Sequence, residues 1–118
     1  MKVLIIEQEK TLQKSLCNFM EHQKNFQVSS ACSWKEGMTL WKAASFDMVL
    51  CSDRLPDGNG VDTLKTLIEQ KPSLISILMT ARHDESLKQE ALEVGIRGYL
   101  EKPFDLKQLE EAMESGKI

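Results

Sequence analysis

The sequence predicts an α/β fold in which helices cover both faces of a five-stranded parallel sheet. Short apolar runs alternate along the 118 residues with segments whose apolar residues recur at helical spacing. Continuous apolar runs such as residues 3–6 and 75–79 are typical of strands that are buried on both faces, as in a parallel sheet. Right-handed crossovers between successive parallel strands then place helices on both sides of the sheet.

Five strand–helix units follow one another without a repeat or a linker. Ser33 and Glu36 fit a capping box that begins the second helix, Lys71 and Pro72 close the third, and Asp105 caps the last. Residues 115–118 are expected to be a frayed end or a point where a longer chain continues. Strands are expected at residues 3–6, 26–32, 46–52, 75–79 and 98–101, and helices at about residues 10–23, 38–44, 61–68, 87–94 and 106–113.

Composition limits the classes of function. The length suits one domain over residues 1–118, and the net charge of −3 comes from charges of mixed sign, so direct nucleic-acid contact is not expected. No apolar run is long enough to span a bilayer, and the apolar N-terminal segment is too short for a signal peptide. The three cysteines lack metal-ligand spacing and indicate a reducing compartment, so a cytoplasmic protein is expected.

Polar residues follow the strands at what would be one edge of the sheet. In parallel α/β sheets, ligands bind at the carboxyl ends of the strands, where these side chains would meet. An acid, a hydroxyl and a lysine in one place suit phosphoryl chemistry, although each alone is more typical of a solvated loop. The first strand leads to Glu7 and Gln8, the third to Ser52 and Asp53, the fourth to Thr80 and the fifth to Lys102.

Four motifs give the chain a resemblance to the receiver domain of two-component response regulators. The resemblance implies a flavodoxin-like (βα)5 fold with strand order 2-1-3-4-5. It also implies phosphoryl transfer from a histidine kinase to an Asp after the third strand, with Mg²⁺ held by acids after the first. The motifs are Leu4-Ile5-Ile6-Glu7-Gln8-Glu9, Leu55-Pro56-Asp57-Gly58-Asn59-Gly60, Thr80-Ala81-Arg82 and Gly98-Tyr99-Leu100-Glu101-Lys102-Pro103-Phe104.

The resemblance assigns roles to four residues. Thr80 and Tyr99 match the switch hydroxyl and the switch aromatic residue, and Lys102 matches the lysine that contacts the phosphoryl group. Glu7 matches the first acid. The resemblance also implies a cis peptide bond between Lys102 and Pro103, which X-Pro bonds tolerate. For Tyr99, the alternative is a half-buried strand residue, because aromatic residues favour strands in any case.

Two positions depart from the family pattern. The family places its acceptor Asp four residues before the loop proline, and here that position is Ser52. The count from Asp47, which matches a frequent acid five residues before the acceptor, gives the same answer. Gln8 stands where the family has an Asp that binds Mg²⁺ directly.

These departures weaken both metal binding and nucleophilic attack. Mg²⁺ prefers carboxylate oxygens and loses its water reluctantly, so no cofactor and no bound divalent cation are expected. A serine hydroxyl, unlike a carboxylate, needs a general base, and only Glu7 is near. Lys102 is expected to form an ion pair with Glu7. The alternative for Ser52 is a purely structural role, as a small polar residue that hydrogen-bonds to nearby backbone.

Asp53 offers a second hypothesis, a working receiver. Successive strand residues point to opposite faces, so Asp53 is expected to turn away from the cavity unless a bulge redirects it. In a working receiver the phosphoryl group would go to Asp53, redirected by a bulge, or to Ser52, and Glu7, Gln8 and Asp53 would be the Mg²⁺ ligands. Otherwise Asp53 is expected to cap backbone or to pair with Arg54.

The favoured hypothesis is a degenerate receiver domain that is not an enzyme. It would be the N-terminal part of a longer regulator and control an output domain, such as a transcription regulator, through protein contact. The expected face comprises helix 4, strand 5 and helix 5, which would also form a homodimer; a histidine kinase is a further possible partner, and no membrane contact is expected. A deliberate replacement at Ser52 that blocks phosphorylation is an open alternative. A flavin- or nucleotide-binding enzyme is disfavoured, because no Gly-rich loop follows the first strand.

Overall fold

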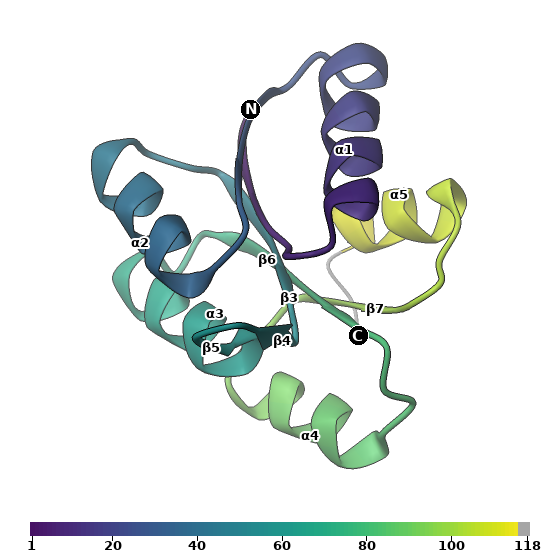
Figure 1. Cartoon of the computed structure of the whole chain (residues 1–118). Coiled ribbons are helices and arrows are strands. Elements are labelled where there is room, and N and C mark those ends of the chain that lie inside the picture. The colour runs from purple at the N-terminus through teal and green to yellow at the C-terminus, as the bar shows by residue number, and fades with distance from the viewer. Residues whose placement is uncertain (116–118) are drawn as a thin grey trace.

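The computed structural model of the chain describes residues 1–115, so the expectation for the last three residues lies outside the described part. Five parallel strands form one sheet in the order β2-β1-β3-β6-β7, which is the predicted order 2-1-3-4-5 when they are counted along the chain (Figure 1). The strands are β1 (Lys2–Ile6), β2 (Gln27–Ala31), β3 (Met48–Ser52), β6 (Ile75–Thr80) and β7 (Gly98–Glu101).

Helices follow each strand of this sheet, as the apolar periodicity predicts. The first expected helix divides at residue 19, where α-helical pairing changes to a π-helical turn, η1 (Phe19–Gln23). Gly95, with φ of 89°, follows α4 and supplies the left-handed residue that commonly ends a helix. The helices are α1 (Lys10–Asn18), α2 (Trp34–Ala43), α3 (Gly60–Gln70), α4 (Glu85–Glu93) and α5 (Leu106–Ser115).

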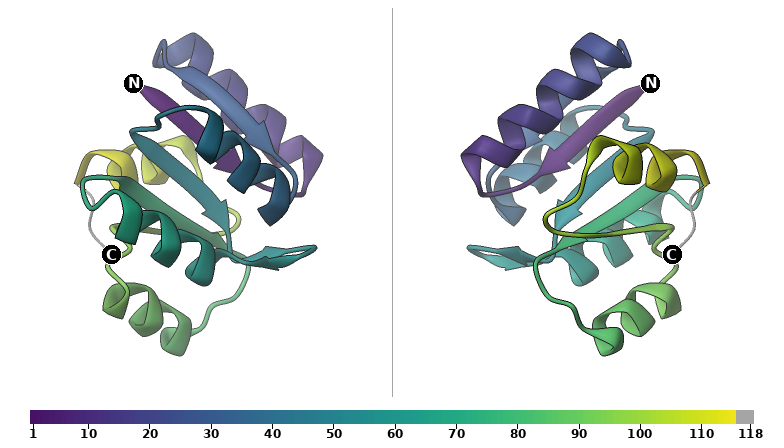
Figure 2. Two further views of the ribbon diagram at one scale, coloured as in Figure 1. Left: turned by 90° about the vertical axis from the view of Figure 1, so that its left-hand side faces the viewer. Right: turned by 90° about the vertical axis from the view of Figure 1, so that its right-hand side faces the viewer.

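The sheet divides the core into two layers. On one face, Val49 and Cys51 of β3 belong to an apolar cluster with residues of α2, α3 and α4. On the other face, Met48 and Leu50 cluster with residues of α1, η1 and α5. Figures 1 and 2 show the same division of the helices. Because strand side chains alternate, the next residues along β3 also diverge: Ser52 continues the α1–α5 side and Asp53 the α2–α4 side.

A short antiparallel hairpin after β3 was not predicted from the sequence. Its strands, β4 (Arg54–Leu55) and β5 (Gly58–Asn59), project from the sheet edge in Figure 2. Asp57 at the turn accepts hydrogen bonds from the backbone N–H groups of Trp34 and Lys35, at 2.8 and 3.0 Å, which attaches the hairpin to the start of α2. Gly60 follows as the first residue of α3. A Cβ atom there would overlap the Ser52 carbonyl oxygen, so α3 can begin this close to the end of β3 only with glycine.

Candidate functional site

A cavity of about 310 Å³ lies at the carboxyl ends of the parallel strands. It is the edge at which the sequence predicts the polar residues to meet. Thr80 is buried beside this cavity but does not line it, and Gln8 lines it as an exposed residue. The lining residues are Glu7, Gln8, Glu9, Ser52, Asp53, Arg54, Ala81, Arg82 and Lys102.

One half of the cavity is organised by Lys102. Its ammonium group donates to Glu7 Oε1 at 2.7 Å and to Ser52 Oγ at 3.2 Å. The Glu7 side chain is only 1 % exposed, and its second oxygen accepts the backbone N–H of Glu9 at 2.9 Å. The expected ion pair between Glu7 and Lys102 is therefore present, and the expected cis bond between Lys102 and Pro103 is present as well.

The other half is organised by Asp53 and Arg82. The Arg82 guanidinium donates from Nε to Asp53 Oδ2 at 2.8 Å and from Nη2 to Oδ1 at 3.1 Å. Thr80 Oγ1 donates to Asp53 Oδ2 at 3.2 Å and accepts the backbone N–H of Arg82 at 2.9 Å. The hydrogen bonds and charge of Asp53 raise the pKa of Arg82 above its ordinary value.

Two expectations for Asp53 differ from what is seen. Its partner is Arg82 and not Arg54, because the carboxylate turns toward the loop after β6 rather than along its own hairpin. It also lines the cavity instead of turning wholly away. No bulge precedes Asp53 within β3, since the register between β3 and β6 is unbroken from Met48 and Ile75 to Ser52 and Met79.

Arg82 is the cationic partner of Asp53 that sequence reasoning missed. Arg82 stands two residues after Thr80 in the Thr80-Ala81-Arg82 motif, which could have marked it as a candidate. The sequence does not show that its side chain pairs with Asp53, 29 positions earlier.

Tyr99 lies on the same side of the sheet as Asp53, packed against the α2–α4 cluster. Its hydroxyl is buried, and among the described residues no group is placed to hydrogen-bond with it. Burial raises the pKa of Tyr99, and the nearby negative charge of Glu101 adds to the effect. The Lys88 ammonium lies 5.9 Å from the centre of the Tyr99 ring.

The two buried carboxylates of this cavity are already paired with cationic side chains. Within residues 1–115, no three His, Cys, Asp or Glu side chains are grouped so that they could hold a metal ion. Glu7 and Asp53 each already bind a cationic side chain, and Gln8 contributes only an amide. An ion such as Mg²⁺ would compete with Lys102 for Glu7 and with Arg82 for Asp53. The exposed Glu9 carboxylate, which also lines the cavity, accepts among the described residues only the Thr11 backbone N–H.

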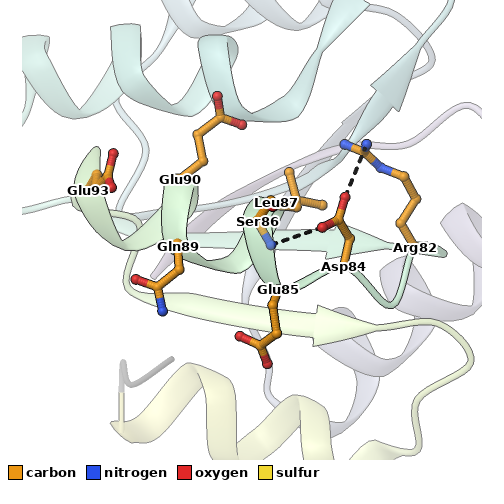
Figure 3. A pocket seen from close by; sticks show the side chains of 8 residues that line it. All are labelled: Arg82, Asp84, Glu85, Ser86, Leu87, Gln89, Glu90 and Glu93. Carbon is orange, nitrogen blue, oxygen red and sulfur yellow. Dashed lines mark hydrogen bonds and ion pairs between the residues drawn. The ribbon is translucent and has the colours of Figure 1, made fainter.

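A second and wider cavity, of about 620 Å³, lies along α4. Figure 3 shows its side chains, with Arg82 directed toward Asp84. Four of its eight lining residues are Asp or Glu, and Arg82 is the cation among them.

No helix within residues 1–115 combines the length and apolar content needed to cross a bilayer.

Comparison with known proteins identifies the family. The family model described as response regulator receiver domain matches residues 3–114. The probable C4-dicarboxylate response regulator DctR of Bacillus subtilis is 31 % identical over 117 residues, which cover 98 % of this chain and 52 % of that protein. The transcriptional regulatory protein CiaR of Streptococcus pneumoniae is 30 % identical over 108 residues, covering 92 % of this chain and 47 % of that protein.

A solved structure agrees with these relatives. The non-phosphorylated HemR receiver domain from Leptospira biflexa is 28 % identical, with a TM-score of 0.85, and the match covers 96 % of this chain and 94 % of that one. The chain spans about half the length of the two curated relatives named above. On the family model and these relatives together, the chain belongs to the family of response regulator receiver domains.

Proposed function

We propose that this receiver domain signals without being phosphorylated. One observation carries the proposal: the hydroxyl of Ser52, which the family spacing puts at the acceptor position, accepts from a Lys102 ammonium that also binds the buried Glu7 carboxylate. The positive charge that would meet a phosphoryl group is thus already neutralised by a neighbouring side chain. The domain then acts as a regulatory module through protein contact and has no enzymatic turnover.

Ser52 is poorly placed to act as a nucleophile. A serine hydroxyl needs a base to remove its proton, and Glu7 is the carboxylate that shares Lys102 with it. Oε1 of that carboxylate already accepts the Lys102 ammonium at 2.7 Å, so it is not directed at the Ser52 proton. Ser52 is also only 4 % exposed. These features favour a structural role for the hydroxyl.

The second candidate function is a working receiver that uses Asp53 or Ser52, with Mg²⁺ held by Glu7, Gln8 and Asp53. Asp53 favours it, because this carboxylate does line the cavity. However, Arg82 occupies both of its oxygens, and that bidentate contact would have to break before the carboxylate could attack a phosphorus atom. We therefore rank this function second.

Intact mass spectrometry tests the choice. The chain is incubated with a small-molecule phosphodonor and Mg²⁺, and its mass is expected to stay unchanged. The matched control is the double variant Gln8→Asp, Ser52→Asp, which restores both missing carboxylates and is expected to gain one phosphoryl group. A stoichiometric gain by the unaltered chain would reject the proposal. Hydroxylamine-labile phosphate would then assign Asp53, and acid-stable phosphate Ser52.

The wider setting is part of the same proposal. Because the relatives are about twice as long and include a transcriptional regulatory protein, we infer that residues 1–118 belong to a longer regulator with an output domain. The surface formed by α4, β7 and α5 would contact that domain or a second copy, and a histidine kinase is a further possible partner. Family membership and three free cysteines favour the cytoplasm. Sedimentation velocity over a range of concentrations tests the homodimer.

A further inference from the structure

Arg82 contacts two elements that are far apart in the sequence. Its Nε and Nη2 atoms donate to Asp53, at the end of β3. Its Nη1 atom lies 3.8 Å from Oδ2 of Asp84, the residue that caps α4. Asp84 Oδ1 in turn accepts the backbone N–H of Ser86 at 2.9 Å, as Figure 3 shows. The guanidinium therefore joins the sheet edge to the first turn of α4.

The same residue borders both cavities. Arg82 lines the cavity at the strand ends and also the cavity along α4. Asp53, with a side chain 5 % exposed, depends on Arg82 for two of its hydrogen bonds and on Thr80 for the third. Loss of Arg82 would leave a buried carboxylate with a single donor, which is unfavourable. Arg82, which lies in the loop between β6 and α4, therefore contacts the end of β3 through Asp53 and the cap of α4 through Asp84.

We propose that Arg82 is a positioning residue that fixes the loop between β6 and α4, and the first turn of α4, in one arrangement in the unphosphorylated protein. This inference rests on the proposed function, in which the α4 face acts without phosphorylation. Arg82 sets the Thr80 hydroxyl as well, because Thr80 Oγ1 accepts from the Arg82 backbone while donating to the carboxylate that Arg82 binds. Asp53 accepts the hydrogen bonds of both Thr80 and Arg82 in this arrangement, and Ser52 takes no part in these contacts.

Amide hydrogen exchange followed by NMR tests the inference in the variant Arg82→Gln. Two amides report directly: residue 82, which donates to Thr80, and Ser86, which donates to Asp84. Both are expected to exchange at least about tenfold faster, since a lost charge-assisted hydrogen bond commonly exceeds the free energy of a tenfold change. The capping amides of Glu36 and Asp62, on α2 and α3, are expected to keep their rates.

Three further variants separate positioning from general destabilisation. Arg54→Gln removes a charge from the same cavity and is expected to change none of the four rates. Asp53→Asn is expected to reproduce the Arg82→Gln pattern, and Arg82→Lys to restore part of the protection. Unchanged rates at residues 82 and 86 in Arg82→Gln, or an equal rise at all four amides, would overturn the inference.

The two proposals fail in different ways. A phosphoryl group gained by the unaltered chain would reject the proposed function, whatever the exchange rates show. Unchanged exchange at residues 82 and 86 in Arg82→Gln would reject the positioning role, whatever the mass shows. If both proposals hold, adding phosphodonor and Mg²⁺ leaves all four rates of the unaltered chain as they were.

Discussion

The two buried carboxylates of the strand-end cavity are neutralised by different chemistry. Glu7 is bound by a single ammonium group, which it shares with Ser52, and the Lys102 side chain that carries it is 22 % exposed. Asp53 is bound by a bidentate guanidinium and a hydroxyl, and its Arg82 partner is 41 % exposed. In each half of the cavity, the negative charge of the buried carboxylate is therefore balanced by a cationic side chain of the protein itself.

The sheet itself separates these halves. Glu7, Ser52 and Lys102 continue the strand faces that pack on α1 and α5, whereas Asp53 and Thr80 continue the faces that pack on α2, α3 and α4. Adjacent residues of one strand thus serve different layers. It follows that the Asp53 side chain does not lie where the Ser52 side chain lies, although the two residues are neighbours in the sequence.

The largest expected effect is at the Glu7 half. Lys102→Met would leave Glu7 almost fully buried with no cationic partner, and removing one member of a buried pair typically costs about 3–5 kcal/mol. Because Lys102 is partly exposed, we expect a loss of about 3 kcal/mol in the free energy of unfolding. Urea denaturation followed by circular dichroism measures it.

Lys65→Met is the matched control for that variant, since Lys65 is exposed on α3 and is expected to change stability by less than about 0.5 kcal/mol. Equal stability of the Lys102 and Lys65 variants would show that Glu7 is held by its backbone contact alone. The single-ammonium description of this half would then be wrong.

A smaller effect is expected at the Asp53 half. Asp53→Asn keeps the shape of the side chain and a carbonyl oxygen for Thr80, but it removes the charge that Arg82 binds. Water can solvate the released guanidinium, so we expect a loss of about 1–2 kcal/mol, at the low end for bonds to charged groups. The same urea titration measures it, and a loss larger than that of Lys102→Met would reverse the comparison.

The sequence was sufficient for the fold and for one half of the cavity. Apolar runs predict the strand positions, including the end of the third strand at residue 52, and the resemblance to receiver domains puts Ser52 at the acceptor position. The contact between Glu7 and Lys102 could be expected because both residues follow strands that end at the same edge of the sheet and carry opposite charges.

The contact between Asp53 and Arg82 in the other half could be found only from the three-dimensional structure. The pairing of Asp53 with Arg82 depends on the path of a loop and on the rotamers of two side chains, neither of which has a sequence period. The hairpin of β4 and β5 was hidden because each of its strands has two residues, too few to show alternation. The π-helical turn after residue 18 likewise keeps the amphipathic pattern of an ordinary helix.

The smallest expected effect is a gain in stability at Tyr99, which lies on the same side of the sheet as Asp53. Its buried hydroxyl finds no partner among the described residues, and an unsatisfied buried polar group costs about 1–3 kcal/mol. Tyr99→Phe is therefore expected to raise the free energy of unfolding by about 1 kcal/mol at neutral pH. Burial also raises the pKa of Tyr99 above its ordinary value of 10.0.

The unfolded chain thus loses the tyrosine proton at a lower pH than the folded protein does, so the contribution of Tyr99 to stability falls as pH rises past 10. The advantage of the phenylalanine variant is expected to widen over that range, and urea titrations of both proteins at neutral and alkaline pH measure it. A less stable phenylalanine variant would mean that the hydroxyl does bind a group in this layer, with a bound water as the simplest candidate.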